Sequence, residues 1–349
     1  MKFKIGKIEF SENRFVLIAE AGVNHNGSLK IAEKLIKKAK ESGADIIKFQ
    51  TYKSEKLTIK KAPRFWNWKG EIKQKGSQYD SYKRLDSFDE KEYIQLKKLC
   101  DKHKIEFMST PFDLGAVKML KKIGVKGFKV ASCDITNFPL LNEIAKTKLP
   151  IILSTGGSNL KEIKESVKFI EKQGNNKICI LHCTLCYPTK MNDANLQSIT
   201  FLKKKFPNNI IGLSDHTLET VTPVLSVALG ARVVEKHFTI NKRLKKSADH
   251  WLSVNPNELR EIKKNSDLAM ISLGKENKEV LNCEKLARSN ARRSIVAKRY
   301  IKKNEYFSLD NLDFKRPGFG ISPKLVKDIL NKRSKKNIIK DEIIKKSYF

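Results

Sequence analysis

The stretch FVLIAEAG, residues 15–22, is a short apolar run ending in small and acidic residues, and it decides the fold. A segment with helical periodicity follows at residues 29–41, and a second apolar run, ADIIKFQT, comes next at residues 44–51. Short apolar, β-branched runs predict buried strands, and two parallel strands need a crossover helix between them. These residues therefore predict one strand-helix-strand unit.

The same unit recurs along the chain. Further apolar runs lie at residues 106–111, 127–132, 150–155, 177–183, 210–216 and 232–238, with helical periodicity between them at residues 90–103, 114–123 and 160–173. Right-handed crossovers between parallel strands close such a sheet on itself. Eight alternations predict an α/β fold, a (β/α)8 TIM barrel.

The barrel is expected to occupy residues 1–273 and to end with a helix at residues 256–272. A polar linker at 274–290 follows, and residues 291–349 are too short and too rich in turn signals, such as Arg316-Pro317-Gly318, to extend the barrel. They predict a small β-rich domain. The irregular stretch 52–86, which carries Trp66 and Trp68, is long for a barrel loop, and such loops are usually functional or mobile.

Composition limits the classes of function. With 40% hydrophobic residues the chain is no disordered polymer, and no run of about 18 apolar residues predicts a membrane span. The N-terminus MKFKIGKIEF lacks the apolar core of a signal peptide, so we expect a cytoplasmic protein without a membrane partner. The net charge of +33 suggests nucleic acid, but only twelve of the 71 basic residues are arginines. Dispersed lysines do not form a binding face, and we expect no nucleic-acid partner.

Polar groups at the strand ends predict an active site. Barrel enzymes build their sites at the carboxyl ends of the strands, and residues two apart share a face of a strand. Choosing one face per strand gives a polar group at every end: Glu20, Lys48, Gln50, Thr110, Lys129, Ser154, His182, Ser214, His216, Glu235 and His237. This pattern indicates an active site without naming the reaction.

Two histidines and two lysines narrow the chemistry. His216 and His237 end adjacent strands, so their imidazoles can converge on one divalent metal, with Glu20 as a third ligand or a base. A histidine pair without metal is the alternative. Lys48 and Lys129, with the hydroxyls of Thr110, Ser132 and Ser154, predict a cradle for a phosphate or carboxylate.

Other functions stay open on the residues alone. Lys48 or Lys129 could instead be the Schiff-base nucleophile of a barrel aldolase. From other classes, the chain could be a basic nucleic-acid-binding barrel, or the tail could make it an interaction protein.

A set of ordered motifs resembles the sialic acid synthase family. They are AEAGVNHNGS (19–28), IIKFQT (46–51), MSTPF (108–112), FKVASCDITNFPLL (128–141), LSTGG (153–157), LHCTLCYPT (181–189), GLSDHT (212–217), VEKHFT (234–239) and KRPGFGIS (315–322). Members of that family, the N-acetylneuraminate, legionaminate and pseudaminate synthases, condense phosphoenolpyruvate with an N-acetylmannosamine-type sugar. The resemblance covers essentially the whole chain, and the tail is similar to the family's antifreeze-like SAF domain.

The resemblance implies a role for each matching position. It implies a divalent metal, usually Mn²⁺, on His216 and His237, and phosphoenolpyruvate on Lys48, Thr110, Lys129, Ser132, Ser154, Tyr187 and Ser214. Glu20, Gln50 and Asp249 would contact the sugar or order water, and Asp134 matches a position proposed as a base. Arg316 would reach the sugar's N-acyl group across a domain-swapped homodimer. Carbon–oxygen cleavage would release phosphate, and the sugar stays open among the family's substrates.

Overall fold

The computed structural model describes residues 1–66, 76–86 and 88–349, so Trp68 lies outside the described residues. Its contacts divide the chain into two units, Met1–Gly274 and Lys275–Phe349. The first unit ends one residue after the expected barrel limit at 273, and the second begins inside the expected linker.

The first unit is a parallel barrel. Within the described residues its strands are β3 (Val16–Gly22), β4 (Ile46–Thr51), β5 (Glu106–Pro111), β6 (Phe128–Val130), β7 (Ile151–Ser154), β8 (Ile178–Cys183), β9 (Ile210–Asp215) and β10 (Val233–His237). They pair in the order β5-β4-β3-β10-β9-β8-β7-β6, and the outermost two, β5 and β6, pack against each other. Each strand falls in one of the predicted apolar runs, and the (β/α)8 prediction is confirmed.

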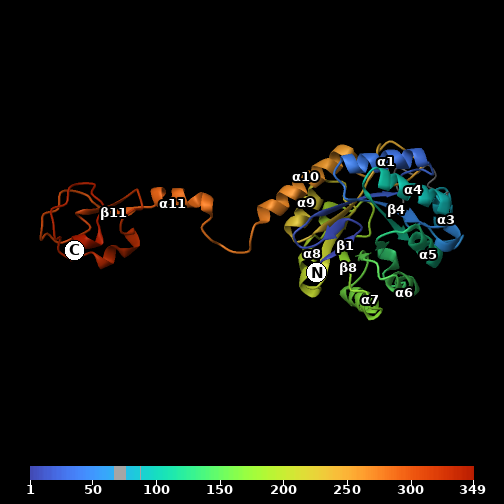
Figure 1. Cartoon of the computed structure of the whole chain (residues 1–349), viewed down its shortest axis with the longest axis horizontal. Helices are drawn as coiled ribbons and strands as arrows, with labels where there is room; N and C mark the ends of the chain where they lie inside the picture. Colours follow the sequence, from blue (N-terminus) through green and yellow to red (C-terminus); the bar gives the residue numbers. More distant parts are fainter. Residues whose placement is uncertain (67–75, 87) are drawn as a thin grey trace. The chain divides into compact units, whose positions relative to one another are not determined.

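Helices surround these strands (Figure 1). They are α1 (Leu29–Glu41), α4 (Glu90–Lys102), α5 (Leu114–Ile123), α6 (Phe138–Lys146), α7 (Leu160–Lys172), α8 (Gln197–Lys205), α9 (Val221–Ala228) and α10 (Pro256–Leu273). In α1, Ser28 caps the first turn, and Ala32, Leu35, Ile36 and Ala39 form the buried stripe. That three-and-four spacing turns one helix face to the sheet. The stretch 52–86 is less irregular than predicted, because it contains α2 (Ser54–Leu57) and α3 (Gln78–Lys83).

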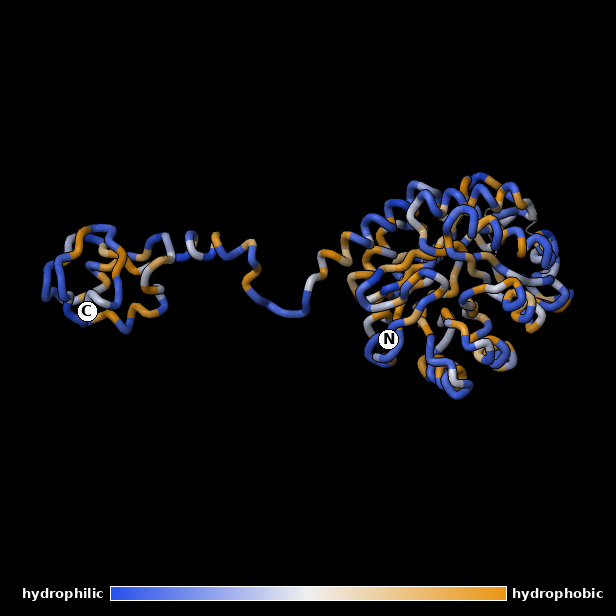
Figure 2. Tube along the Cα trace, in the orientation of Figure 1, coloured by the Kyte–Doolittle hydropathy of each residue, from blue (hydrophilic) through white to orange (hydrophobic). Residues whose placement is uncertain are grey.

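A hairpin that the sequence analysis missed fills the amino end of the barrel. Strands β1 (Phe3–Ile5) and β2 (Ile8–Phe10) pair antiparallel. Phe3, Ile5 and Phe10 pack with inward-facing apolar side chains of the strands, among them Ile18 and Met108. Figure 2 shows hydrophobic colours concentrated on the strands of this unit. The interior of the barrel at the amino ends of its strands is therefore apolar. The polar groups lie at the carboxyl ends of the strands.

The second unit has its own core. It contains η3 (Asn282–Glu284), α11 (Lys285–Ala291), β11 (Ser294–Ala297), β12 (Leu312–Lys315), η4 (Pro323–Asp328) and η5 (Lys346–Tyr348). Strands β11 and β12 pair antiparallel, and isolated bridges such as Ile301 with Ile338 extend the β structure. Ile295, Phe307 and Ile344 are among the buried residues. Across the described parts of both units, no helix is long and apolar enough to cross a membrane.

Candidate active site

The register of β9 and β10 places the predicted histidines together. Ser214 pairs with Glu235 and Asp215 with Lys236, so the next residues, His216 and His237, come side by side. Because strand side chains alternate, Ser214 and Glu235 share a face with the two histidines. The Ser214 hydroxyl donates to Glu235 Oε1 at 3.0 Å, and the His216 and His237 ring centroids lie 5.6 Å apart.

The surroundings of the two imidazoles suit a divalent metal. His216 Nδ1 lies 2.9 Å from the Thr184 carbonyl oxygen, and donation there leaves the lone pair on Nε2 free for a ligand. His237 Nδ1 is buried without a hydrogen-bond partner among the described residues, and it lies 3.8 Å from Asp249 Oδ2. Burial, aided by the nearby His216, lowers the pKa of His237 well below its usual value. This imidazole is therefore neutral, the form that binds metal.

The rest of a coordination shell would have to come from elsewhere. Within the described ranges, no group of three or more His, Cys, Asp or Glu side chains is arranged to hold a metal ion. A site with two protein ligands leaves positions for substrate and water, as catalytic metal sites require. Tyr187 lies against the pair, with its ring centroid 4.0 Å from that of His216 and 5.9 Å from that of His237, whose ring plane is nearly perpendicular to its own.

A chain of alternating charges lines the barrel beside the histidines. Lys48 Nζ lies 2.7 Å from Glu20 Oε2 and donates to Thr110 Oγ1 at 2.9 Å. Glu235 stands between the two lysines, 3.8 Å from Lys48 Nζ and 3.5 Å from Lys129 Nζ. Gln50 completes the group by donating to Glu20 Oε1 at 3.0 Å. All the charged members are buried.

Glu235 was predicted as a polar group at a strand end, on the face of the histidines, but sequence reasoning assigned it no role. Although burial opposes its ionisation, Lys129 and Lys48 lower its pKa below the usual glutamate value. Glu235 is therefore the anion that holds both lysines in place.

The same charges bear on the Schiff-base alternative. Burial opposes a charged Lys48, but Glu20 and Glu235 outweigh it and raise the pKa of Lys48 above its usual value. A Schiff-base lysine must reach the neutral amine near neutral pH. The environment of Lys48 thus favours a permanent cation that binds anions. Burial raises the pKa of Glu20, against the opposing effect of Lys48.

Two serines and a glycine turn form the other side of the cradle. Ser132 Oγ accepts a hydrogen bond from the Gly156 amide at 2.9 Å. A Cβ at Gly156 would lie 2.9 Å from Ser132 Oγ and 3.0 Å from Cys183 Sγ, so the close approach requires glycine. The Ser154 hydroxyl is buried and has no hydrogen-bond partner in the described part of the chain. An unpaired buried hydroxyl is costly, which points to a ligand as its partner.

Hydrogen bonds brace the segment that carries Asp249 against the loop after β3. Ser253 Oγ donates to the Asp249 carbonyl at 2.6 Å and accepts from Asn24 Nδ2 at 3.1 Å. His250 Nε2 lies 3.0 Å from Asn26 Oδ1. These contacts hold the Asp249 carboxylate beside His237.

Three other predicted site residues, Asp134, His182 and Arg316, have surroundings different from those of the histidine pair and the two lysines. Asp134 lies on η1 (Ser132–Asp134), where it accepts a hydrogen bond from Asn137 at 3.2 Å, and burial raises its pKa. His182 Nε2 lies 2.9 Å from the Ala194 carbonyl oxygen, which satisfies it. Arg316 is exposed in the second unit, directly after β12.

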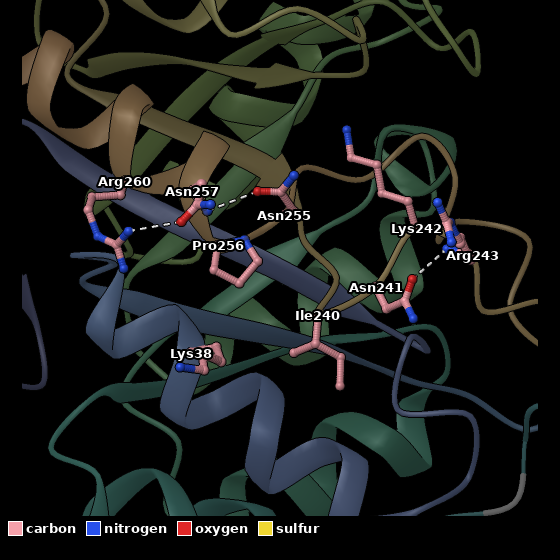
Figure 3. A pocket seen from close by; sticks show the side chains of 9 residues that line it. All are labelled: Lys38, Ile240, Asn241, Lys242, Arg243, Asn255, Pro256, Asn257 and Arg260. Carbon is pink, nitrogen blue, oxygen red and sulfur yellow. Dashed lines mark hydrogen bonds between the residues drawn. The ribbon is translucent and has the colours of Figure 1, made fainter.

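A hollow of about 520 Å³ lies elsewhere on the first unit (Figure 3). Its lining residues come from α1, the segment after β10 and the start of α10, and none of them is a predicted site residue: Lys38, Ile240, Asn241, Lys242, Arg243, Asn255, Pro256, Asn257 and Arg260. Asn255 Oδ1 already accepts from the amides of Asn257 and Glu258. The first turn of α10 is thus capped by the chain itself.

Comparison with known protein families shows which family the chain belongs to. Residues 35–278 match the NeuB family, and residues 292–349 match the SAF domain. The chain belongs to the NeuB family. This confirms the resemblance on which the site roles were predicted.

Relatives with named activities match most of the chain. An N,N'-diacetyllegionaminic acid synthase of Campylobacter jejuni is 40% identical, over 95% of this chain and 98% of that protein. The human N-acetylneuraminate-9-phosphate synthase is 36% identical, over 86% and 82%. Among solved structures, the N-acetylneuraminic acid (sialic acid) synthetase of Leptospira borgpetersenii in complex with citrate superposes with a TM-score of 0.73. It is 36% identical and covers 82% of this chain and 95% of that one.

Proposed function

We propose that the chain is a nonulosonic acid synthase that joins phosphoenolpyruvate to an N-acyl mannosamine-type sugar. One observation carries the proposal: two buried lysines, and a Ser154 hydroxyl with no partner among the described residues, lie at the same barrel end as two buried histidines, of which His237 is neutral. An anion cradle beside a candidate metal site matches a reaction between an anionic donor and a carbonyl acceptor. Acid synthases among the relatives support the same class.

The cradle is proposed to hold phosphoenolpyruvate. The lysines supply the positive charge and the hydroxyls orient the oxygens of phosphate and carboxylate, through Lys48, Thr110, Lys129, Ser132, Ser154, Tyr187 and Ser214. Because Glu235 fixes both ammonium groups before the ligand arrives, little reorganisation accompanies binding.

His216 and His237 are proposed to hold a divalent cation, Mn²⁺ in our assignment. When bound, the cation supplies Lewis-acid polarisation of the sugar's carbonyl oxygen. The chain's own contribution is to keep His237 neutral and to orient His216 through Thr184. Asp249 and Gln50 are proposed to contact the sugar hydroxyls.

The proposed bond changes balance with one water consumed and one phosphate released. C3 of phosphoenolpyruvate bonds to the aldehyde carbon of the open-chain sugar, and the aldehyde oxygen takes up a proton. The C2=C3 π pair forms this new bond, and water bonds to the electron-deficient C2 and gives up one proton, which balances the one taken up by the aldehyde oxygen. The C2–oxygen bond to phosphate then breaks, the second water proton passes to the departing phosphate, and C2 becomes a ketone. Glu20 and Asp134, whose pKa values burial raises, are the proposed proton-exchanging carboxyls.

We further propose a domain-swapped homodimer in which Arg316 binds the N-acyl group at the partner's barrel. Large apolar side chains exposed on each unit by itself support association: Leu268, Ile271 and Leu273 on α10 of the first unit, and Val280, Leu281 and Leu286 in the second unit. We call these six residues the apolar segment. Several exposed apolar groups close together in the sequence of one unit indicate an interaction surface.

Phosphate release from phosphoenolpyruvate tests the proposed function. The assay pairs phosphoenolpyruvate with N-acetylmannosamine or with 2,4-diacetamido-trideoxy analogues, in Mn²⁺ or in EDTA. We expect metal-dependent release with one sugar, lost in His237→Ala and retained in His103→Ala, a control at the end of α4. Absence of release with every sugar, together with borohydride trapping of a substrate on Lys48 or Lys129, would replace the proposal with the aldolase.

A further inference from the structure

A buried ion pair lies directly behind the two histidines. Lys236 and Asp215 are 1% and 3% exposed, and Lys236 Nζ lies 2.6 Å from Asp215 Oδ2. They are register partners between the Ser214–Glu235 and His216–His237 positions. Strand alternation turns them to the face opposite the site, so neither side chain belongs to the cradle.

The pair binds the turn that carries His216. Lys236 Nζ donates to the Thr217 carbonyl oxygen and, at 3.3 Å, to the Glu219 carbonyl oxygen. Asp215 accepts from the Thr217 amide at 2.9 Å and from its hydroxyl at 3.1 Å. One side chain of β10 therefore fixes residues 215–219 against the strand that ends in His237.

The opposite side of the same turn is also held. The His216 carbonyl oxygen accepts from the Thr189 amide at 2.9 Å, and His216 Nδ1 meets the Thr184 carbonyl. The segment 184–189 thus sets the ring direction of His216. Lys236 sets the distance of its backbone from β10.

Stability alone is a poor explanation for such a pair. Burying two charges carries a large desolvation penalty, and apolar replacement of a buried pair is often neutral or stabilising. An ammonium that spans a carboxylate and two carbonyls of one turn does what an apolar residue cannot, because it fixes that turn's backbone. Groups that hydrogen-bond the ligands of a metal typically alter metal affinity 10- to 100-fold, and this pair acts one step further out, through the backbone of the turn that carries His216.

We propose that the Lys236–Asp215 pair is a positioning device that sets the spacing of His216 and His237 for a divalent cation. The inference rests on the proposed function, because it takes those histidines as the cation's protein ligands. Lys236 and Asp215 touch neither substrate nor cation and act through the turn of residues 215–219.

The test measures Mn²⁺ binding to metal-free protein by the electron paramagnetic resonance signal of free Mn²⁺. The variant Asp215→Leu with Lys236→Met removes both charges without leaving either unpaired. We expect its Mn²⁺ affinity to fall about 10- to 100-fold. Phosphoenolpyruvate binding without metal, measured by calorimetry, should stay within about threefold of wild type, because the lysines of the cradle lie on β4 and β6 and Ser214 on β9 faces away from the substituted pair. If the double variant fails to fold, Asp215→Asn, which is close in shape to the native residue, replaces it in the test. We expect its Mn²⁺ affinity to fall as well, but by less.

A matched control and His237→Ala separate the outcomes. Lys203→Met with Glu12→Leu removes an ion pair that lies away from the site, in which Lys203 Nζ is 2.8 Å from Glu12 Oε2. This control should leave Mn²⁺ affinity unchanged. If His237→Ala abolishes Mn²⁺ binding but the Asp215 and Lys236 variants bind like wild type, positioning is overturned and the proposed function stands. Equal losses of Mn²⁺ and phosphoenolpyruvate affinity would show general damage and also overturn positioning. A wild-type protein that binds no Mn²⁺ would overturn both proposals.

Discussion

His250 shows how single buried side chains tie the site to the stability of the barrel. It is fully buried, with Nδ1 2.7 Å from Thr239 Oγ1 and Nε2 3.0 Å from Asn26 Oδ1. A neutral ring serves both contacts by accepting at Nδ1 and donating at Nε2. Burial lowers the pKa of His250 to about 4, and burial lowers the pKa of His25, stacked on Phe88, to about 3.

These two histidines predict acid sensitivity. Above about pH 6.5 the ring is neutral in both folded and unfolded chains, so its contribution to stability is fully present there. As pH falls from 6.5 toward 4, the unfolded chain takes up protons that the folded chain does not, and stability is lost. Each histidine adds a slope of up to about 1.4 kcal/mol per pH unit.

Urea unfolding at pH 7.5, 6.0 and 5.0 measures this slope. We expect His250→Asn to be less stable at pH 7.5 but to lose less stability on acidification than wild type. Parallel pH profiles for the two proteins would contradict the assignment.

At the scale of elements, the crowding of β9 against its neighbours makes Gly212 necessary. A Cβ there would overlap the Val233 carbonyl oxygen and lie 2.6 Å from Leu181 Cδ2 and 2.9 Å from Val233 Cβ. We expect Gly212→Ala to destabilise the barrel by about 1–3 kcal/mol through overpacking.

Gly124, the C-cap of α5, provides the comparison in the same urea assay. Its φ is +87° and nothing lies within 4 Å of the added Cβ, so Gly124→Ala costs only backbone strain, about 1 kcal/mol. If Gly212→Ala proved as stable as wild type, β9 would have to be packed less tightly than described.

Element prediction from the sequence succeeded where periodicity was long and failed where it was short. The apolar runs behind β3 to β10 are long enough to show as strands between helices. The hairpin of FKI and IEF is too short for periodicity, and it is ordered only by packing Phe3, Ile5 and Phe10 into the barrel.

Site prediction followed the same physics. Alternation alone placed His216, His237 and the lysines on one face. It could not show that Glu235 lies between Lys48 and Lys129, because that depends on distances across the barrel. It also could not show that Lys236 and Asp215, on the other face, hold the turn of His216.

For the whole molecule, the apolar segment predicts the state of association. Ile271 and Leu286 are 78% and 76% exposed, the most exposed of its six residues. We expect the double variant Ile271→Glu with Leu286→Glu to shift the protein from dimer to monomer in sedimentation velocity, because charges would lose their hydration in an apolar interface.

A single charge placed outside the apolar segment is the control. Ile339, 64% exposed in the second unit, should tolerate substitution by glutamate without a change in sedimentation. A wild-type protein that sediments as a monomer at micromolar concentration would contradict the dimer.

The hairpin at the amino end can complete its packing only late in the synthesis of the chain. Phe3, Ile5 and Phe10 belong to a core that also includes Val16 of the first barrel strand and Val233 of the last. The ribosome makes the hairpin more than 200 residues before Val233, so its full set of partners exists only after residue 233 has left the exit tunnel. Their burial in this core therefore cannot be complete before the last barrel strand is made, and the hairpin is among the last parts of the first unit to be fully packed.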